Sequence, residues 1–429
     1  MNGMEERVAG GRVVESDPHT KKASPLHGLP VDVLLRFTPW LGRADLSQLM
    51  TTSKGLYDVF LPELIKGAGT ILLSRILAFH RFLRVHEHSG APRVRWLNRF
   101  EYYSSHVHPF VSTISASEGA RVVLEILGRA SNLNLLTLDN VGDFDADQLR
   151  AVLSTLLRLT YVDLRRVKME SHQDILLDAT APLATVRLSL AMSVPNYAVA
   201  TDPSPMLRAH MSSTTIETLY LQNVQLTPQS GPFPAVRRLQ ITEYYLSYGR
   251  GAEMLQTLFP AAREIWLFNR YLDPEFRYRL ERGYGVASEM EELRKRNREW
   301  QLAHRSQLWP SLKYLRVDGE HAAYALGLTC RVDRLEVLMS GTEMRLLETL
   351  FEEMRPRCFG FYMGGGGGGG PISFYETVPR FLKPIARTRI VTHLVVWTDD
   401  GVLAGLTLEE LMVSLYSGKW GINHFLTDG

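Results

Sequence analysis

The sequence has few cysteines, little net charge and no long apolar run, and each of these absences excludes a class of protein. Its 429 residues include only Cys330 and Cys358, too few for a disulfide framework or a cysteine zinc site. We interpret both as small buried hydrophobic residues. A formal net charge of +2 provides no broad attraction to nucleic acids or anionic membranes. We therefore expect a globular protein that binds neither nucleic acid nor membrane.

The most apolar stretch is too short and too interrupted to span a membrane. TILLSRILAFHRFL, which begins at Thr70, contains Arg75, His80 and Arg81, whereas a span needs about 20 apolar residues. We predict an amphipathic helix inside the protein. Residues 1–25 have no apolar signal-peptide core and are predicted to form a disordered tail. These features favour a cytoplasmic protein, a nuclear protein, or one found in both compartments.

Motifs that carry chemistry are also missing. The glycine run 364–370 is not followed by Gly-Lys-Ser/Thr, so we expect a flexible loop there rather than a phosphate-binding loop. His86 and His88, like His106 and His108, lack a matching Cys or carboxylate pattern for a metal. There is no Gly-x-Ser-x-Gly or His-Glu-x-x-His motif. We expect no cofactor, no metal and no catalytic role, although an enzyme with scattered catalytic residues is an alternative.

Three short helices are predicted within Val31–Ile65, where apolar residues recur at helical spacing. Pro30 suits a first turn, and Pro39 should end the first helix. Asp45, followed three residues later by Gln48, has the pattern of an N-cap for the second helix. A segment this small seldom folds unaided, so we expect its apolar faces to dock on another surface.

The run LPVDVLLRFTPWLGRADLSQLMTTSKGLYDVFLPEL, which begins at Leu29, resembles an F-box. Its Leu-Pro, acid, Leu-Leu, Asp-Leu, Ser-Lys-x-Leu-Tyr-Asp and Leu-Pro elements follow the family's order, while Thr38 and Pro39 depart from it. The resemblance places an F-box at 26–66. It implies a Skp-type linker protein as partner, and a cullin complex through that linker. The linker contacts that the resemblance implies are Leu29, Pro30, Leu34, Leu41, Leu46, Leu56, Tyr57, Leu61 and Pro62.

A second pattern, Leu-x-x-Leu-x-Leu with close substitutes, recurs within residues 131–429, after a predicted helical connector at 67–130. Most copies follow one another at the spacing of about 20 to 29 residues that is typical of leucine-rich repeats. Each copy predicts a short strand whose aliphatic residues are buried only when neighbouring copies stack. The pattern resembles degenerate leucine-rich repeats. The central residues of the predicted strands are Leu136, Val162, Val186, Leu219, Leu239, Ile265, Leu315, Leu335, Phe359 and Leu394.

The predicted fold class is α/β, with a three-helix F-box, a helical connector and a leucine-rich-repeat solenoid whose parallel sheet lines the concave face. A longer gap between two repeats holds a predicted helix near 275–306, supported by the i,i+4 pairs Glu291 with Lys295 and Glu292 with Arg296. This inserted helix is either a partner-binding element or part of an elongated repeat.

Strand alternation assigns one set of side chains to the concave face. Aromatic residues and arginine dominate binding hot spots, although aromatic residues also favour strands and a loop could cover them. The two arginines among the candidates hint at an acidic or phosphorylated ligand. The substrate-binding candidates are Trp266, Phe268, Tyr362, Trp397, Arg165 and Arg187.

An F-box followed by leucine-rich repeats resembles the substrate receptors of Skp/cullin/F-box ubiquitin ligases. The resemblance implies a non-catalytic subunit that binds an unknown protein substrate and raises its effective concentration near the ubiquitin donor. The alternative is an F-box repeat scaffold that binds partners without directing ubiquitination.

Overall fold

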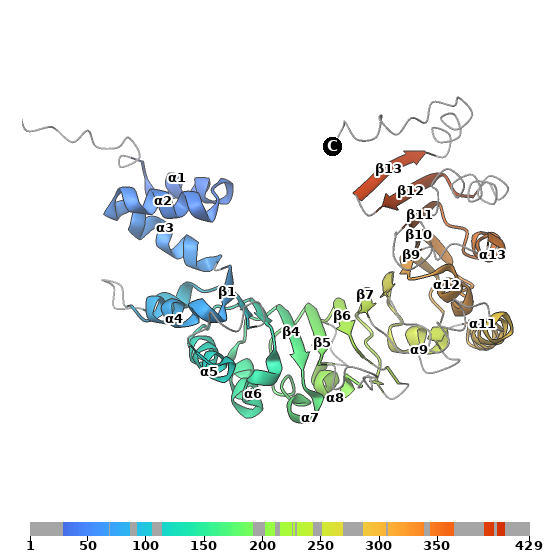
Figure 1. Ribbon diagram of the computed structural model, residues 1–429, viewed down its shortest axis with the longest axis horizontal. Coiled ribbons are helices and arrows are strands. Elements are labelled where there is room, and N and C mark those ends of the chain that lie inside the picture. The colour runs from blue at the N-terminus through green and yellow to red at the C-terminus, as the bar shows by residue number, and fades with distance from the viewer. Residues whose placement is uncertain are drawn as a thin grey trace, which may run out of the picture. The chain divides into compact units, whose positions relative to one another are not determined.

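A computed structural model divides the chain into two compact units (Figure 1). The division lies between Ile65 and Lys66, next to the predicted boundary at residue 66. The predicted tail 1–25 and the glycine loop 364–370 lie outside the described residues. The structure describes residues 29–67, 69–85, 92–104, 114–191, 202–210, 215–224, 226–227, 230–242, 251–268, 286–305, 308–338, 344–363, 390–398 and 401–407.

The described part of the N-terminal unit contains the three predicted helices, α1 Val31–Phe37, α2 Arg43–Thr52 and α3 Lys54–Lys66. The apolar spacing predicted them because each helix turns one stripe of its surface inward.

The helix boundaries follow local chemistry. The first helix ends before Pro39, as predicted, and continues as a 3-10 turn, η2 Thr38–Trp40. The predicted N-cap at Asp45 is wrong, because α2 begins at Arg43 and its N-cap is Gly42. The Gly42 N–H donates to the Asp45 carboxylate at 3.0 Å. Asp45 thus supports the helix start from the third helical position rather than from the cap.

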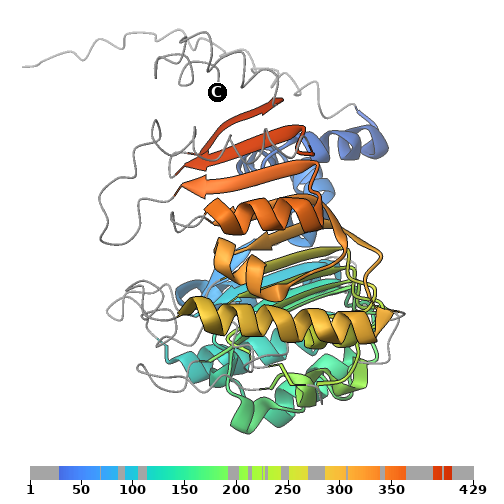
Figure 2. The same cartoon turned by 90° about the vertical axis from the view of Figure 1, so that its right-hand side faces the viewer.

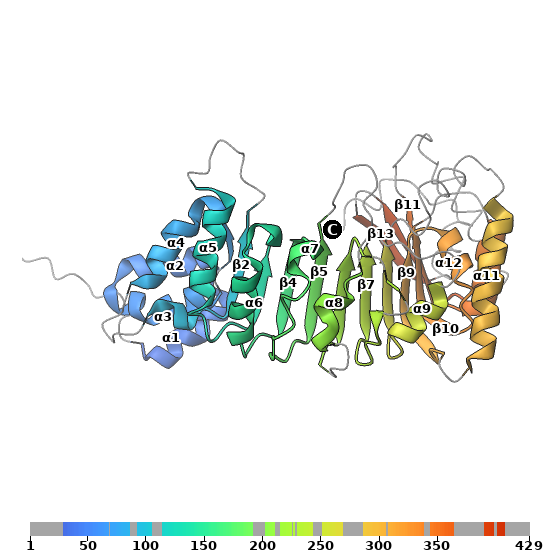
Figure 3. The ribbon, with the colours of Figure 1, turned by 90° about the horizontal axis from the view of Figure 1, so that it is seen from below.

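The second unit is α/β, as predicted, and the strands among its described residues form one open 13-stranded sheet in which strand order follows chain order. Strands β1 to β12 pair in parallel, and β13 pairs antiparallel with β12. Figure 3 shows successive strands side by side. The strands are β1 Thr70–Leu72, β2 Arg99–Tyr103, β3 Leu135–Leu138, β4 Tyr161–Val167, β5 Thr185–Leu190, β6 Thr218–Gln222, β7 Arg238–Thr242, β8 Glu264–Phe268, β9 Ser311–Val317, β10 Arg331–Leu338, β11 Cys358–Met363, β12 His393–Thr398 and β13 Gly401–Thr407.

The strand register follows the sequence pattern, and each strand predicted from a repeat is confirmed. The central residues pair with one another from strand to strand, beginning with Leu136 and Val162 and ending with Phe359 and Leu394. All of the predicted central residues are buried. A single row of aliphatic and aromatic side chains therefore runs through the core beneath the sheet.

The predicted helical connector at 67–130 is partly wrong, because it also contributes β1 and β2 to the sheet. Phe100 on β2 pairs with Leu136 and is buried, as is Tyr102. The sequence pattern missed β2 because aromatic residues occupy its two core positions. The stretch from Thr70 begins as β1 and becomes a helix only at α4, Ile76–Arg84.

The helices of the second unit lie along one face of its sheet (Figures 1 and 2). The opposite face carries no helix among the described residues, and we call it the helix-free face. Besides α4, the helices are α5 Ala116–Leu127, α6 Ala146–Thr155, α7 Met169–His172, α8 Ser204–Leu207, α9 Gly251–Leu258, α11 Val286–Ala303, α12 Glu320–Leu326 and α13 Met344–Met354, with 3-10 turns η3 Leu73–Arg75, η4 Arg93–Trp96, η5 Val141–Asp143 and η6 Arg208–His210.

The long helix α11 occupies the predicted insertion, between β8 and β9. Of the predicted pairs, Glu292 lies 3.5 Å from Arg296, whereas Glu291 accepts a hydrogen bond from the Tyr324 hydroxyl at 2.5 Å. On its buried side, the Gln301 amide donates to the Gly327 carbonyl at 2.9 Å. These contacts bind α11 to the next helix, which favours the elongated-repeat interpretation over a free partner-binding element.

A left-handed turn of the backbone lies at the end of β4 and just beyond the ends of β3 and β6. Asn140, Arg166 and Asn223 adopt left-handed φ angles of 56, 54 and 57°, which non-glycine residues rarely do. The turn sends the next side chain back into the core. The buried residues that follow are Val141, Val167 and Val224.

A buried histidine makes part of the stability of the second unit pH-dependent. Burial lowers the pKa of His210 below its ordinary value of 6.5, although a backbone hydrogen bond at Leu176 opposes this shift. The unfolded chain therefore binds more protons below about pH 6.5, so stability is retained above that pH and lost as the pH falls. We expect the melting temperature to drop between about pH 7 and pH 5. In a His210→Gln variant the drop should be smaller than in an exposed His393→Gln control, and equal drops would contradict this.

Candidate functional site

Large apolar side chains at the start of the N-terminal unit are exposed. The exposed fractions are 38% for Leu29, 54% for Val31, 50% for Phe37 and 85% for Trp40, and we call these four the exposed α1–η2 residues. Large apolar side chains gathered in one short segment are typical of a surface that another protein covers.

The predicted linker contacts fall into three groups. Leu34, Leu46, Leu56 and Leu61 are buried within the chain, so they stabilise the folded unit and present no surface to a partner in this conformation. Leu29 and Pro30 are exposed, and Leu41, Tyr57 and Pro62 are half-buried. The predicted contacts do not include the exposed residues Val31, Phe37 and Trp40, because a motif position does not show whether a side chain is exposed. One available signal was Pro39, which ends the helix and separates Trp40 from the helical stripe.

On the helix-free face, Arg165 forms a forked ion pair with a buried carboxylate. Its Nε and Nη2 atoms donate to Asp163 Oδ2 at 3.1 and 2.7 Å, and its guanidinium lies 5.2 Å from the centre of the Tyr103 ring. The hydrogen bond with Asp163 raises the pKa of Arg165 despite partial burial. Asp163 is thus neutralised by its own strand, and Arg165 is held in place.

Arg187 on β5 lies between two tyrosines. Its guanidinium is 4.7 Å from the centre of the Tyr220 ring, and its Nη1 donates to the Tyr161 hydroxyl at 3.4 Å. Partial burial opposes its charge, yet the Tyr161 hydrogen bond and the charge of Asp163 leave the pKa of Arg187 above its ordinary value. Arg187 is therefore a fixed cation with aromatic neighbours on both adjacent strands.

Aromatic and charged residues gather across β8, β9 and β10. The rings of Trp266 and Tyr314 are 4.8 Å apart, and the Tyr314 hydroxyl donates to Glu336 at 2.5 Å. Arg316 lies 4.8 Å from the centre of the Phe268 ring. Burial and the Glu336 hydrogen bond raise the pKa of Tyr314, so it stays a donor. Together with Arg334, which donates to Glu336 at 2.8 Å, these residues form what we call the β8–β10 cluster.

The structure places the four predicted aromatic candidates in two separate pairs, Trp266 with Phe268 on β8 and Tyr362 with Trp397 on β11 and β12. Trp266 pairs in register with Gln240 and Arg316, whereas Tyr362 pairs with Trp397 at the other side of β9 and β10. The side chains of Tyr362 and Trp397 lie outside the described residues.

Besides Arg316, the predicted candidates do not include three further members of the β8–β10 cluster, Tyr314, Arg334 and Glu336. Each lies directly beside a central leucine, Leu315 or Leu335. Strand alternation alone assigns such neighbours to the helix-free face, and this signal could have found them.

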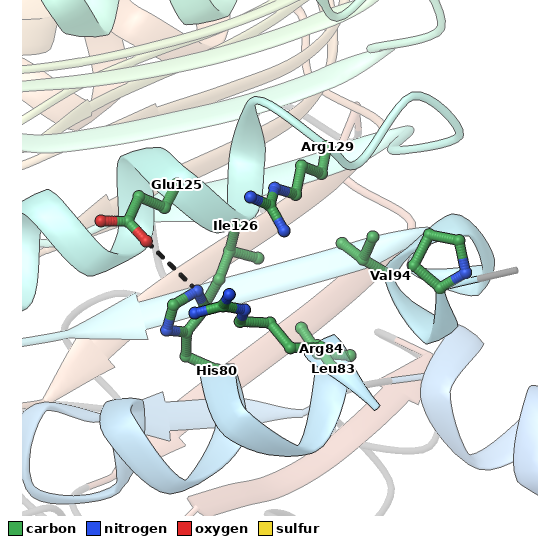
Figure 4. Close-up of a pocket in the computed structure, with 8 residues that line it drawn as sticks. His80, Leu83, Arg84, Val94, Glu125, Ile126 and Arg129 are labelled. Atoms are coloured by element: carbon green, nitrogen blue, oxygen red, sulfur yellow. Dashed lines mark ion pairs between the residues drawn. The ribbon is translucent and has the colours of Figure 1, made fainter. Parts of the chain in front are cut away.

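A pocket of about 270 Å³ lies between α4 and α5 (Figure 4). Glu125 Oε2 lies 3.4 Å from His80 Nε2, and Arg84 and Arg129 also line the pocket. Burial lowers the pKa of His80, Glu125 raises it, and the two arginines lower it further. The described lining contains no serine, threonine, cysteine or lysine to serve as a nucleophile.

The two cysteines are not activated for reaction, and the described residues form no metal-binding cluster. Burial raises the pKa of Cys330 to about 12 and also raises that of Cys358, so neither is a ready thiolate at neutral pH. In the described ranges, no group of three or more His, Cys, Asp or Glu side chains could hold a metal ion. The paired histidines at 86, 88, 106 and 108 lie outside the described residues. In the described part of the chain, no helix is both long and apolar enough to cross a membrane.

No protein-family model matches the chain, and no curated protein matches it either. A function is therefore inferred from its own motifs, contacts and exposed surfaces.

Proposed function

We propose that this protein is the substrate-recognition subunit of a Skp/cullin/F-box type ubiquitin ligase. Its N-terminal unit is an F-box that binds a Skp-type linker, and its repeat domain binds a protein substrate. The subunit performs no chemistry. It contributes to rate by holding substrate lysines near the ubiquitin-charged enzyme.

The observation that carries the proposal is the exposure of large apolar residues on a segment that matches the F-box pattern. The Trp40 side chain is 85% exposed. Burying this large apolar side chain against a partner would be favourable. The buried motif leucines support the same interpretation. They pack the three helices together, and the exposed α1–η2 residues remain available to contact a partner.

The sheet supports the assignment of leucine-rich repeats. Each strand pairs only with its neighbours in the chain, as expected for a solenoid of stacked repeats whose parallel sheet lines the concave face. Val141, Val167 and Val224 stand where the family has Asn or Cys, and their burial after a left-handed turn agrees with degenerate repeats. On this reading the helix-free face is the concave surface.

The β8–β10 cluster supports a protein ligand on that face. Tryptophan, tyrosine and arginine are the residue types enriched at binding hot spots. Trp266 and Phe268 are only half-buried, so a partner can still bury apolar surface against them.

A double Phe37→Ser, Trp40→Ala substitution is expected to abolish co-purification with a Skp-type linker. Loss of two hot-spot side chains should weaken binding by about 30-fold or more. Both side chains are exposed, so the helices should stay folded. The measurement is linker binding by the purified full chain.

The matched control is Leu302→Ala, which removes an exposed side chain of 55% exposure from α11 and should leave linker binding unchanged. Wild-type binding by the double variant would contradict the proposal. Recovery of the linker without a cullin would instead favour a repeat scaffold that does not direct ubiquitination.

A further inference from the structure

Arg187 differs from the other arginines of the sheet. Each of the others in the described strands lies within ion-pair distance of a carboxylate, whereas Arg187 has no carboxylate partner among the described residues. The pairs are Arg99 with Glu101, Arg165 with Asp163, Arg166 with Asp139, Arg238 with Glu264, Arg316 with Glu336, Arg331 with Asp333 and Arg334 with Glu336.

The acid nearest in register is already occupied. Asp163 pairs directly with Arg187 in the parallel ladder between β4 and β5, but both of its oxygens accept hydrogen bonds from Arg165. Asp163 is also buried. Arg187 therefore keeps its charge on the face without a carboxylate of its own.

The neighbours of Arg187 position it without neutralising it. A guanidinium has five N–H donors, and the described residues supply one acceptor, the Tyr161 hydroxyl at 3.4 Å. The Tyr220 ring supports the cation from the next strand. The charge of Asp163 on the adjacent strand stabilises the cation, but its oxygens accept hydrogen bonds from Arg165, so an added anion could still accept hydrogen bonds from the Arg187 fork.

We infer that Arg187, flanked by Tyr161 and Tyr220, binds an anionic side chain of a protein segment, either a carboxylate or a phosphorylated residue. This inference rests on the proposed function and names the substrate class that the repeat domain takes. Both groups suit the planar guanidinium fork, which can donate two parallel hydrogen bonds.

The rest of the face indicates a peptide rather than a free anion. From Arg187 the register runs through Tyr220 and Gln240 to Trp266. These residues lie on consecutive strands about 4.8 Å apart, so Arg187 and Trp266 are separated by about 14 Å, which about four extended residues can span. The expected segment therefore carries an acidic residue and, about four residues away, an apolar one.

The test uses the purified full chain and arrays of random peptides with a fixed central residue, which is glutamate, phosphoserine or glutamine. Glutamate- or phosphoserine-centred peptides should bind at least about tenfold better than glutamine-centred ones. Comparing the glutamate-centred with the phosphoserine-centred peptides shows whether the site prefers a carboxylate or a phosphate group. Arg187→Gln should remove the preference, and Arg187→Lys should retain part of it because the charge remains without the fork.

The matched control is Arg238→Gln, since Arg238 is an exposed arginine on the same face that already pairs with Glu264 at 2.9 Å. Its preference for acidic peptides should equal that of the wild type. Equal binding of acidic and glutamine-centred peptides, or an unchanged preference in Arg187→Gln, would overturn the inference. A melting temperature for each variant separates loss of the site from loss of the fold.

Linker binding is measured on the same protein preparations, so the two proposals fail separately. An acidic preference in a chain that binds no linker would retain this site and reject the ubiquitin-ligase role. Linker binding by a chain with no preference for acidic peptides would reject this site and leave the proposed ubiquitin-ligase role standing.

Discussion

A Leu56→Ala substitution is expected to unfold the N-terminal three-helix unit. Leu56 is 2% exposed, and removing a buried leucine side chain costs about 2 to 5 kcal/mol because the cavity closes only partly. A unit of this size rarely has more than about 3 to 5 kcal/mol of stability from its core. The expected result is rapid amide hydrogen exchange and proteolysis within residues 29–65, with the sheet still protected.

Leu29→Ala is the matched control for this prediction. It makes the same chemical change at a side chain that is 38% exposed, and should leave hydrogen exchange in the helices near the wild-type level. Equal exchange in the two variants would mean that Leu56 is not part of a stabilising core. This pair also shows why a loss of linker binding in Leu56→Ala would say nothing about direct contact.

A Glu353→Ala substitution is expected to destabilise the sheet unit by about 3 to 5 kcal/mol, because it leaves a buried cation unpaired. Arg294 of α11 is 6% exposed at its side chain and forms an ion pair with Glu353 of α13. Arg294 also donates to the Tyr324 carbonyl at 2.7 Å. Arg298 binds the same carboxylate, so the Glu353 side chain joins α13 to α11, two helices that are separated in the chain by α12.

The melting temperature of the full chain measures the loss. Glu352→Ala is the control, since Glu352 is the exposed neighbour of Glu353 and its removal should change stability by less than about 0.5 kcal/mol. If the two variants had the same melting temperature, the ion pair would contribute no net stability, and α11 would be held by its other contacts.

The strands were predictable because the side chains that each strand buries lie close together in the sequence. A strand whose two inward residues face helices needs two aliphatic residues at fixed spacing, and this appears in the sequence as Leu-x-x-Leu-x-Leu. The same rule failed at Phe100 and Tyr102, where the core accepts aromatic residues. Strand β13 was not predicted, since it pairs antiparallel with β12 and belongs to no repeat.

The candidate site was less predictable, because exposure and charge pairing depend on neighbours in space. Motif positions identify Leu34 and Leu29 equally, and only the folded unit shows that one is buried and the other exposed. Arg165 and Arg187 likewise look alike in sequence. Their difference comes from Asp163, which bonds to Arg165 and leaves Arg187 without a carboxylate.

Chain-ordered pairing of the strands has a consequence for how the sheet comes apart. Each strand is hydrogen-bonded only to the strands just before and after it in the chain, so the cooperativity of unfolding is of nearest-neighbour type. Opening can begin at β1, which is three residues long, and proceed strand by strand without breaking a distant contact. Hydrogen-exchange protection should rise from β1 towards the middle strands, and a damaged terminal strand should fray while the centre of the sheet stays folded.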